Sequence, residues 1–152
     1  MAVFLCSISA WCQSSMIVSL GTEVIENKLF DFAEESFRQN RMPLSVMPSG
    51  KYGFISESPL LMAVVDVTSS NTVKEVDFLC GAAMWYGIDD KLESEGYTLT
   101  KPGNATLGNG DVVPQKTYTK GSTICLVQTI DRDVKQVIFK RQAAKPKTKR
   151  KK

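Results

Sequence analysis

The residue types that do most enzyme chemistry are unevenly represented in this chain. It has no histidine, which excludes serine–histidine and cysteine–histidine nucleophile pairs, histidine zinc sites and histidine general bases. Catalysis would therefore have to use carboxylates, lysine, tyrosine or cysteine. Because these groups form no recognisable catalytic arrangement in the sequence, we expect a protein that is not an enzyme and that binds no cofactor or metal.

The densest group of carboxylates consists of Asp89, Asp90, Glu93 and Glu95. Carboxylates that lie close together can hold Mg²⁺, or one of them can have its pKa raised for acid–base work. The same spacing is typical of a helix N-terminus, where acidic side chains interact favourably with the positive end of the helix dipole. We favour the structural interpretation. The alternative is a carboxylate-dependent enzyme that uses Asp89, Asp90 and Glu93 and loses its activity on Asp89→Asn.

Basic residues are concentrated at the C-terminal end. Residues 140–152 include eight Lys or Arg and no acidic residue, whereas residues 1–139 have 11 basic against 16 acidic residues, a net charge of −5. A short cationic segment of this kind is attracted to phosphate chains, and without aromatic residues it would contact the DNA or RNA backbone non-specifically. We expect residues 142–152 to form a disordered tail. The candidate nucleic-acid-binding residues are Lys145, Lys147, Lys149, Arg150, Lys151 and Lys152.

Four aromatic residues, Trp85, Tyr86, Tyr97 and Tyr118, lie around a predicted junction between helix and sheet. The neighbouring aspartates repel phosphate, so we expect these rings to pack in the core rather than to stack on bases. If the body has a surface for a protein partner, Trp85 and Tyr86 are the candidate residues, because Trp and Tyr supply much of the energy of interfaces.

The cysteines and the apolar runs indicate where in the cell the protein would be located. Four cysteines lie among apolar neighbours without a CxxC pair: Cys6, Cys12, Cys80 and Cys125. This pattern favours reduced, partly buried thiols, and a disulfide between Cys6 and Cys12 is the alternative. The N-terminal apolar run lacks the basic start of a secretory signal, and the longest other run, residues 60–65, is too short to span a bilayer. We expect a cytoplasmic or nuclear protein that is not secreted and has no membrane contact. The tail is similar to a basic nuclear import signal.

In the N-terminal half, residues 3–9 and 16–20 predict two short strands, and Gly21 separates them from a helix over residues 22–39 with one apolar stripe. Residues 44–47 and 52–55 predict a hairpin, and residues 60–68 a central strand. Thr72 and Glu75 match a capping box, which predicts a second helix over residues 72–86. A further short helix is predicted over residues 90–95.

The C-terminal half is typical of strands and turns. Residues 97–100, 117–119, 123–130 and 136–140 predict strands, with a turn at residues 131–133 and with the third strand pairing with the fourth. The fold class we predict is α+β: a mostly antiparallel sheet of about six or seven strands, with the helices near 22–39 and 72–86 packed on one face. Residues 1–141 would form a single domain. The alternative is a β-barrel or sandwich in the C-terminal half with the helices appended at its N-terminal end.

These observations favour a small non-enzymatic accessory protein. Its acidic body would contact a protein partner, and its tail would bind DNA or RNA. The alternative to this hypothesis, besides the carboxylate-dependent enzyme, is a structural component of a virion or particle whose tail neutralises packaged nucleic acid. Symmetric self-association of the body would distinguish that alternative.

Overall fold

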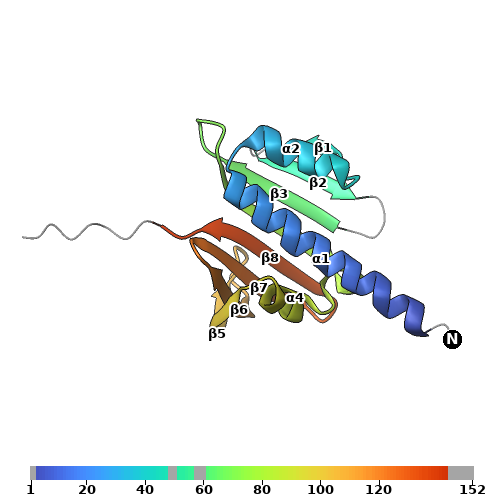
Figure 1. Cartoon of the computed structure of the whole chain (residues 1–152). Coiled ribbons are helices and arrows are strands. Elements are labelled where there is room, and N and C mark those ends of the chain that lie inside the picture. The colour runs from blue at the N-terminus through green and yellow to red at the C-terminus, as the bar shows by residue number, and fades with distance from the viewer. Residues whose placement is uncertain (1–2, 48–50, 57–60, 144–152) are drawn as a thin grey trace, which may run out of the picture.

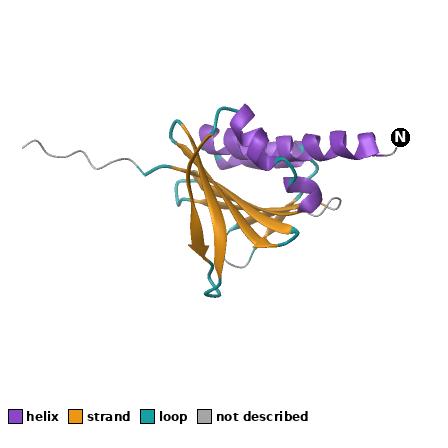
Figure 2. Ribbon diagram, turned by 90° about the horizontal axis from the view of Figure 1, so that it is seen from below, coloured by secondary structure: helices purple, strands orange, loops and turns teal. Residues whose placement is uncertain are grey.

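The computed structural model describes residues 3–47, 51–56 and 61–143, with side chains from Gln13 onward. Helices and a sheet form two layers, and the helices cover one face of the sheet (Figures 1 and 2). The helices are α1 (Val3–Asn27), α2 (Phe30–Gln39), α3 (Ala82–Trp85) and α4 (Ile88–Ser94). The strands are β1 (Leu44–Val46), β2 (Tyr52–Ser56), β3 (Leu61–Val67), β4 (Val73–Gly81), β5 (Thr98–Thr106), β6 (Val112–Lys120), β7 (Thr123–Asp131) and β8 (Val134–Arg141).

Eight strands of the described chain form one sheet in the order β1-β2-β3-β4-β8-β7-β6-β5. Every neighbouring pair is antiparallel. The pairing of β4 with β8 joins the N-terminal strands to the C-terminal strands, so one sheet spans both halves of the chain. The predicted α+β class, with a mostly antiparallel sheet and the main helices on one face, is confirmed, although the sheet of the described residues has eight strands rather than the predicted six or seven.

Alternating side chains give the sheet two different faces. On β3, Leu61, Ala63 and Val65 are fully buried under the helices, whereas Met62 and Val64 lie on the opposite side and are only partly buried. We call that opposite side the open face, because no described helix covers it (Figure 2). The hydrophobic core therefore lies between the sheet and the helices α1, α2 and α4.

Aromatic rings connect the two layers at the centre of the core. The ring of Phe37 on α2 stacks on Phe54 of β2 with centroids 4.3 Å apart. Phe78 of β4 meets Phe139 of β8 edge to face at 6.0 Å. Rings in such arrangements add to the stabilisation that burial alone provides. This cluster fixes α2 against the sheet.

The two strands predicted over residues 3–9 and 16–20 are wrong, because both segments belong to α1. The short apolar runs suggested strands, but α1 crosses the helix-covered face of the sheet, and residues such as Ile17, Val18 and Val24 are completely buried there. Gly21, predicted as a separator, lies within this helix. A β-carbon built at Gly21 would overlap the Phe139 ring, so glycine allows the helix to approach β8 closely.

The helix predicted over residues 22–39 is two helices. Lys28 has a left-handed backbone conformation with φ of 79° and follows the last residue of α1. Its carbonyl accepts a hydrogen bond from the amide of Val73 at 2.8 Å, and Leu29 bridges to Thr72. The contact with a distant part of the chain thus stabilises a break that the apolar stripe did not indicate.

The helix predicted over residues 72–86 is also wrong, since residues 73–81 form β4 and only residues 82–85 form a helical turn, α3. Val76, Phe78 and Cys80 are buried at a spacing of two, whereas Leu79 is exposed on the open face. β3 and β8 supply hydrogen-bonding partners on both sides of the segment. Those backbone partners favour the strand.

Other predicted elements are confirmed. β1 and β2 form the predicted hairpin, although the residues of its turn, 48–50, lie outside the described ranges. The short helix near residues 90–95 is α4, and residues 131–133 form the turn between the paired strands β7 and β8. β3 is an interior strand, two places from the edge strand β1.

Within the described part of the chain, no helix combines the length and the apolar character needed to cross a membrane.

Candidate functional site

The predicted nucleic-acid-binding residues, Lys145 to Lys152, lie outside the described residues, as does the predicted tail from residue 144 onward. Two of the eight C-terminal basic residues, Lys140 and Arg141, belong to β8. The Arg141 guanidinium donates to the carbonyl of Ile25 at 3.2 Å through Nε and to that of Val73 at 3.0 Å. Arg141 therefore connects the end of β8 to α1 and β4.

The predicted partner-binding residues lie at the end of α3 and just after it. Trp85 is partly buried: its indole N–H donates to the carbonyl of Asp133 at 3.2 Å, and the Lys135 ammonium lies 4.4 Å from the ring centroid. Tyr86 is 61% exposed. The prediction of core packing therefore holds for Tyr97 and Tyr118, which are buried, but not for Tyr86.

The carboxylates of the predicted acidic cluster have different surroundings in the structure. The Asp89 carboxylate accepts from Tyr118 Oη at 2.6 Å and from Lys116 Nζ at 2.7 Å. Burial raises the pKa of Asp89, but these two hydrogen bonds and the charges of nearby lysines together outweigh burial, and the pKa is lowered. Asp90 is exposed on the same helix. Among the described residues, no three His, Cys, Asp or Glu side chains are grouped closely enough to hold a metal ion.

Two of the four cysteines can be compared with the prediction of reduced, buried thiols. Cys80 and Cys125 are free and buried. Burial raises the pKa of Cys80 to about 12 and raises that of Cys125 well above its usual value. Such thiols are poor nucleophiles. The side chains of Cys6 and Cys12 lie outside the described part of the chain, so for these two the prediction of reduced thiols, with a disulfide between them as the alternative, stays a prediction.

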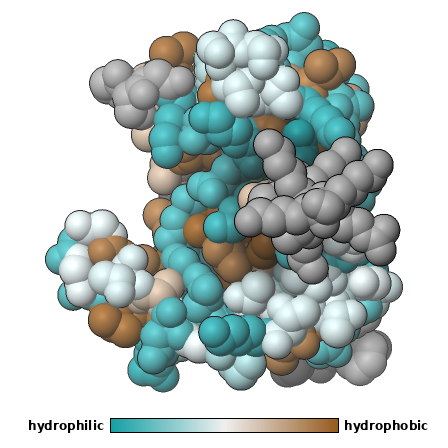
Figure 3. All heavy atoms as spheres, turned by 90° about the vertical axis from the view of Figure 1, so that its left-hand side faces the viewer, coloured by the Kyte–Doolittle hydropathy of each residue, from teal (hydrophilic) through white to brown (hydrophobic). Residues whose placement is uncertain are grey.

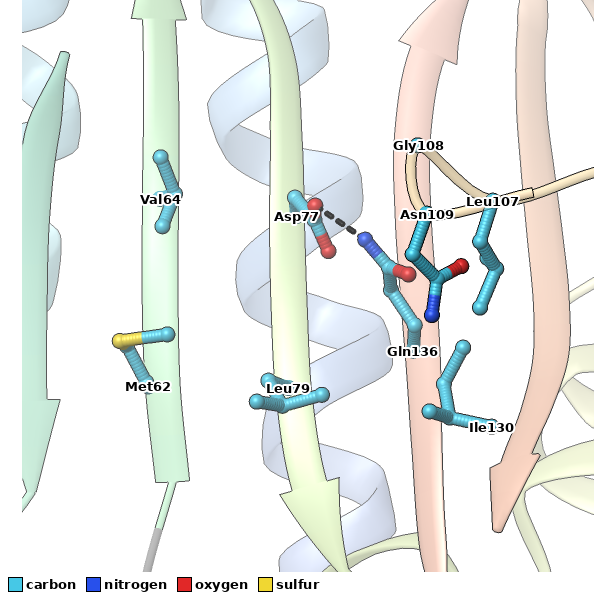
Figure 4. Close-up of a pocket in the computed structure, with 9 residues that line it drawn as sticks. All are labelled: Met62, Val64, Asp77, Leu79, Leu107, Gly108, Asn109, Ile130 and Gln136. Atoms are coloured by element: carbon cyan, nitrogen blue, oxygen red, sulfur yellow. Dashed lines mark hydrogen bonds between the residues drawn. The ribbon is translucent and has the colours of Figure 1, made fainter. Parts of the chain in front are cut away.

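A pocket of about 360 Å³ lies on the open face of the sheet. Figure 3 shows the surface hollowed on the side away from the helices, beside the projecting β5–β6 hairpin. The floor comes from strands β3, β4, β8 and the end of β7, and the loop between β5 and β6 forms one wall (Figure 4). Its apolar lining residues are Met62, Val64, Leu79, Leu107 and Ile130.

Asp77 is the acidic residue of this pocket. Its Oδ2 accepts a hydrogen bond from Gln136 Nε2 on the neighbouring strand at 2.5 Å (Figure 4). Its Oδ1 is buried, and no described residue donates a hydrogen bond to it. Burial is the main reason that the pKa of Asp77 is raised, to about 6. A carboxylate with an unsatisfied oxygen in an apolar hollow can bind a hydrogen-bond donor or a cation.

Further polar groups continue across the open face beside the pocket. Gln136 is directly opposite Gln128 on β7, and Gln128 is directly opposite Gln115 on β6. Gln128 Nε2 donates to Gln115 Oε1 at 2.8 Å. The glutamines therefore form a polar row that begins at Asp77 and leads away from the apolar residues of β3 and β4.

Asp77 is not among the site residues predicted from the sequence, because the segment that contains it was predicted to be a helix. On the predicted helix this aspartate would be one more solvent-facing charge. The period-two burial of Val76, Phe78 and Cys80 is the signal that would have placed Asp77 on the opposite face of a strand. Its contact with Gln136, 59 positions later, leaves no local signal in the sequence.

Comparisons with protein families, with curated proteins and with solved structures find no match for this chain.

Proposed function

We propose that this protein is a non-enzymatic accessory protein whose basic C-terminal tail binds the backbone of DNA or RNA while its acidic body contacts a protein partner. The observation behind the proposal is the separation of charge: eight basic and no acidic residues in positions 140–152, against a net charge of −5 in residues 1–139. The acidic body repels phosphate, so attraction to a polyanion is confined to the C-terminal segment.

The end of β8 supports this division. Because Arg141 bonds two backbone carbonyls of the body, its charge is engaged in the fold. The six basic residues between Lys145 and Lys152 follow it in the sequence. These six are the residues that we assign to phosphate contacts.

The surface proposed for the protein partner is the exposed ring of Tyr86 beside Trp85. The hydrogen bond from Trp85 to Asp133 and the contact with Lys135 hold the indole in one orientation. An aromatic side chain that is already ordered loses little conformational entropy when a partner covers it. Trp85 therefore suits a protein interface better than a mobile side chain would, and the exposed Tyr86 ring adds apolar surface beside it.

The proposal is tested by replacing all six tail cations, Lys145 to Lys152, with glutamine in the full-length chain. Binding to duplex DNA, single-stranded RNA and heparin is measured by fluorescence anisotropy over a salt series. For the unchanged protein we expect a log–log slope of about −5, which corresponds to about a thousandfold weaker binding between 50 and 200 mM salt. The glutamine variant should lose this salt-dependent binding.

A variant in which residues 145–152 are reordered is the matched control. It keeps the charge and should bind as the unchanged protein does, because backbone contact does not depend on the order of the cations. Equal binding by the glutamine variant and the unchanged protein would contradict the proposal. A strong preference for one nucleic acid that persists in the glutamine variant would place recognition on the body instead.

A further inference from the structure

We propose that the hollow on the open face binds a small amphiphilic amine. Its ammonium group would pair with the Asp77 carboxylate once Oδ1, which is buried in this structure, turns towards the hollow. Its apolar chain would lie along β4 over Leu79 and Met62 towards Gly81. None of the residues that line this site belongs to the tail or to the Trp85–Tyr86 pair, so the inference does not depend on the proposed function.

Only one oxygen of the Asp77 carboxylate has a hydrogen-bond donor among the described residues. One of its oxygens accepts from Gln136, and the other is buried with no donor among the described residues. An unsatisfied buried acceptor is costly to the folded protein, and a ligand that donates to it removes that cost. A cationic donor is favoured over a neutral one, because hydrogen bonds between charged groups are stronger.

The surface of the hollow changes from polar to apolar along β4. Asp77, Leu79 and Gly81 follow one another on the same face of β4, and Met62 on β3 is directly opposite Leu79. A second pocket of about 200 Å³ adjoins the first and shares Met62 and Leu79 with it, and its remaining lining is Cys80, Gly81 and Val134. From Asp77 to Gly81 the groove is about 13 Å long. This length suits a polar head followed by a medium-length alkyl chain.

The charges around Asp77 determine which head group the hollow would accept. Glu75 lies two residues before Asp77 on the same face and adds negative potential, and Lys51 is the cation that opposes it. The strand neighbours of Asp77 are Val64 and Ile138, which are both apolar. An anionic head group would therefore meet a carboxylate in an apolar environment, whereas an ammonium group would be attracted to it.

The test is calorimetric titration of the full chain with three probes of equal length: octylamine, octanol and octanoate, at neutral pH and below their aggregation limits. We expect octylamine to bind at least tenfold more tightly than octanol, and octanoate not to bind. Asp77→Asn should reduce octylamine affinity at least tenfold. That variant should fold, because a neutral amide replaces a carboxylate that is partly buried.

Glu75→Gln is the matched control, since it removes an equal charge from the same face of the same strand outside the pocket lining. It should change octylamine affinity less than threefold. Equal binding of octylamine and octanol, or equal losses in the Asp77 and Glu75 variants, would overturn the inference. Octylamine binding seen only when the six tail cations are glutamine would also overturn it, because the chain's own tail would then occupy the hollow.

Discussion

Asp77 and Asp89 show how differently the fold treats two carboxylates. Asp89 is held by a lysine and a tyrosine, and its lowered pKa means that the charged form is favoured. Asp77 has one amide donor and a buried, unpartnered oxygen, and its raised pKa means that the charged form is disfavoured. Of the two, Asp77 is the one with a buried oxygen that no described residue donates to, although Asp89 was the more conspicuous residue in the sequence.

The raised pKa of Asp77 predicts a specific pH dependence of stability. Because its pKa rises from 3.8 to about 6 on folding, the folded state binds the proton more tightly than the unfolded state. The stability from this group is fully present below about pH 4 and is lost as pH rises through about 6. Relative to Asp77→Asn, the unchanged protein should lose about 2 to 3 kcal/mol of unfolding free energy between pH 4 and pH 8.

Urea denaturation of both proteins at several pH values measures this difference. Glu75→Gln serves as the control for removing a carboxylate from the same strand. Its profile should keep most of the pH dependence of the unchanged protein, because burial rather than Glu75 is the main cause of the raised pKa of Asp77. A constant difference between the unchanged protein and the Asp77→Asn variant from pH 4 to pH 8 would show that burial does not perturb this group.

The contact between α1 and β8 determines how closely the helical layer approaches the sheet. Gly21 faces the ring of Phe139, which in turn meets Phe78 and Tyr97 edge to face. The absence of a side chain at one position of the helix therefore allows an aromatic cluster to form beneath it. A helix glycine that is unfavourable for local stability is favoured here by packing.

Gly21→Ala should therefore destabilise the protein. Helix propensity alone predicts a gain of up to about 1 kcal/mol, but a β-carbon that overlaps the Phe139 ring forces the helix or the ring to move. We expect a net loss of about 1 to 3 kcal/mol in unfolding free energy, measured by chemical denaturation. Gly103→Ala, where a β-carbon meets nothing within 4 Å, should be close to neutral. A stabilised Gly21→Ala protein would refute the close approach.

For the molecule as a whole, the pairing of β4 with β8 unites the two halves of the chain. Arg141 strengthens this connection at one end of the pair, where its guanidinium reaches Ile25 near the end of α1 and Val73 at the start of β4. Three segments that are distant in sequence are thus joined at the position where the chain leaves the sheet. Arg141 is thus a basic residue of the C-terminal segment whose charge is engaged in the fold.

Arg141→Gln should reduce the unfolding free energy by about 2 kcal/mol, because two backbone carbonyls lose a charged donor. The adjacent Lys140→Gln removes an equal charge from the open face and should change stability by less than about 0.5 kcal/mol. Thermal and urea unfolding of both variants measure the difference. Equal effects of the two substitutions would mean that general electrostatics, and not the Arg141 hydrogen bonds, stabilise the end of β8.

Much of the fold was predictable where local pattern and tertiary structure agree. The alternating or apolar runs of β3, β7 and β8 have the composition of interior strands, and the turn at residues 131–133 has its aspartates at the expected place. The hairpin β1–β2 and the helix α4 were found for the same reason. In these segments, neighbouring residues alone contain the signal.

The sequence by itself determined the α+β class, the antiparallel C-terminal strands, and the opposite charges of the body and the tail, because these follow from composition and short-range pattern. Tertiary structure alone decided the path of the segment around Asp77. Val76, Leu79 and Cys80 satisfy a helical spacing, while Val76, Phe78 and Cys80 satisfy that of a strand. The choice between them depended on β3 and β8, whose backbones pair with the segment from distant positions in the chain. That pairing placed Asp77 in the hollow, and no local pattern contains the information.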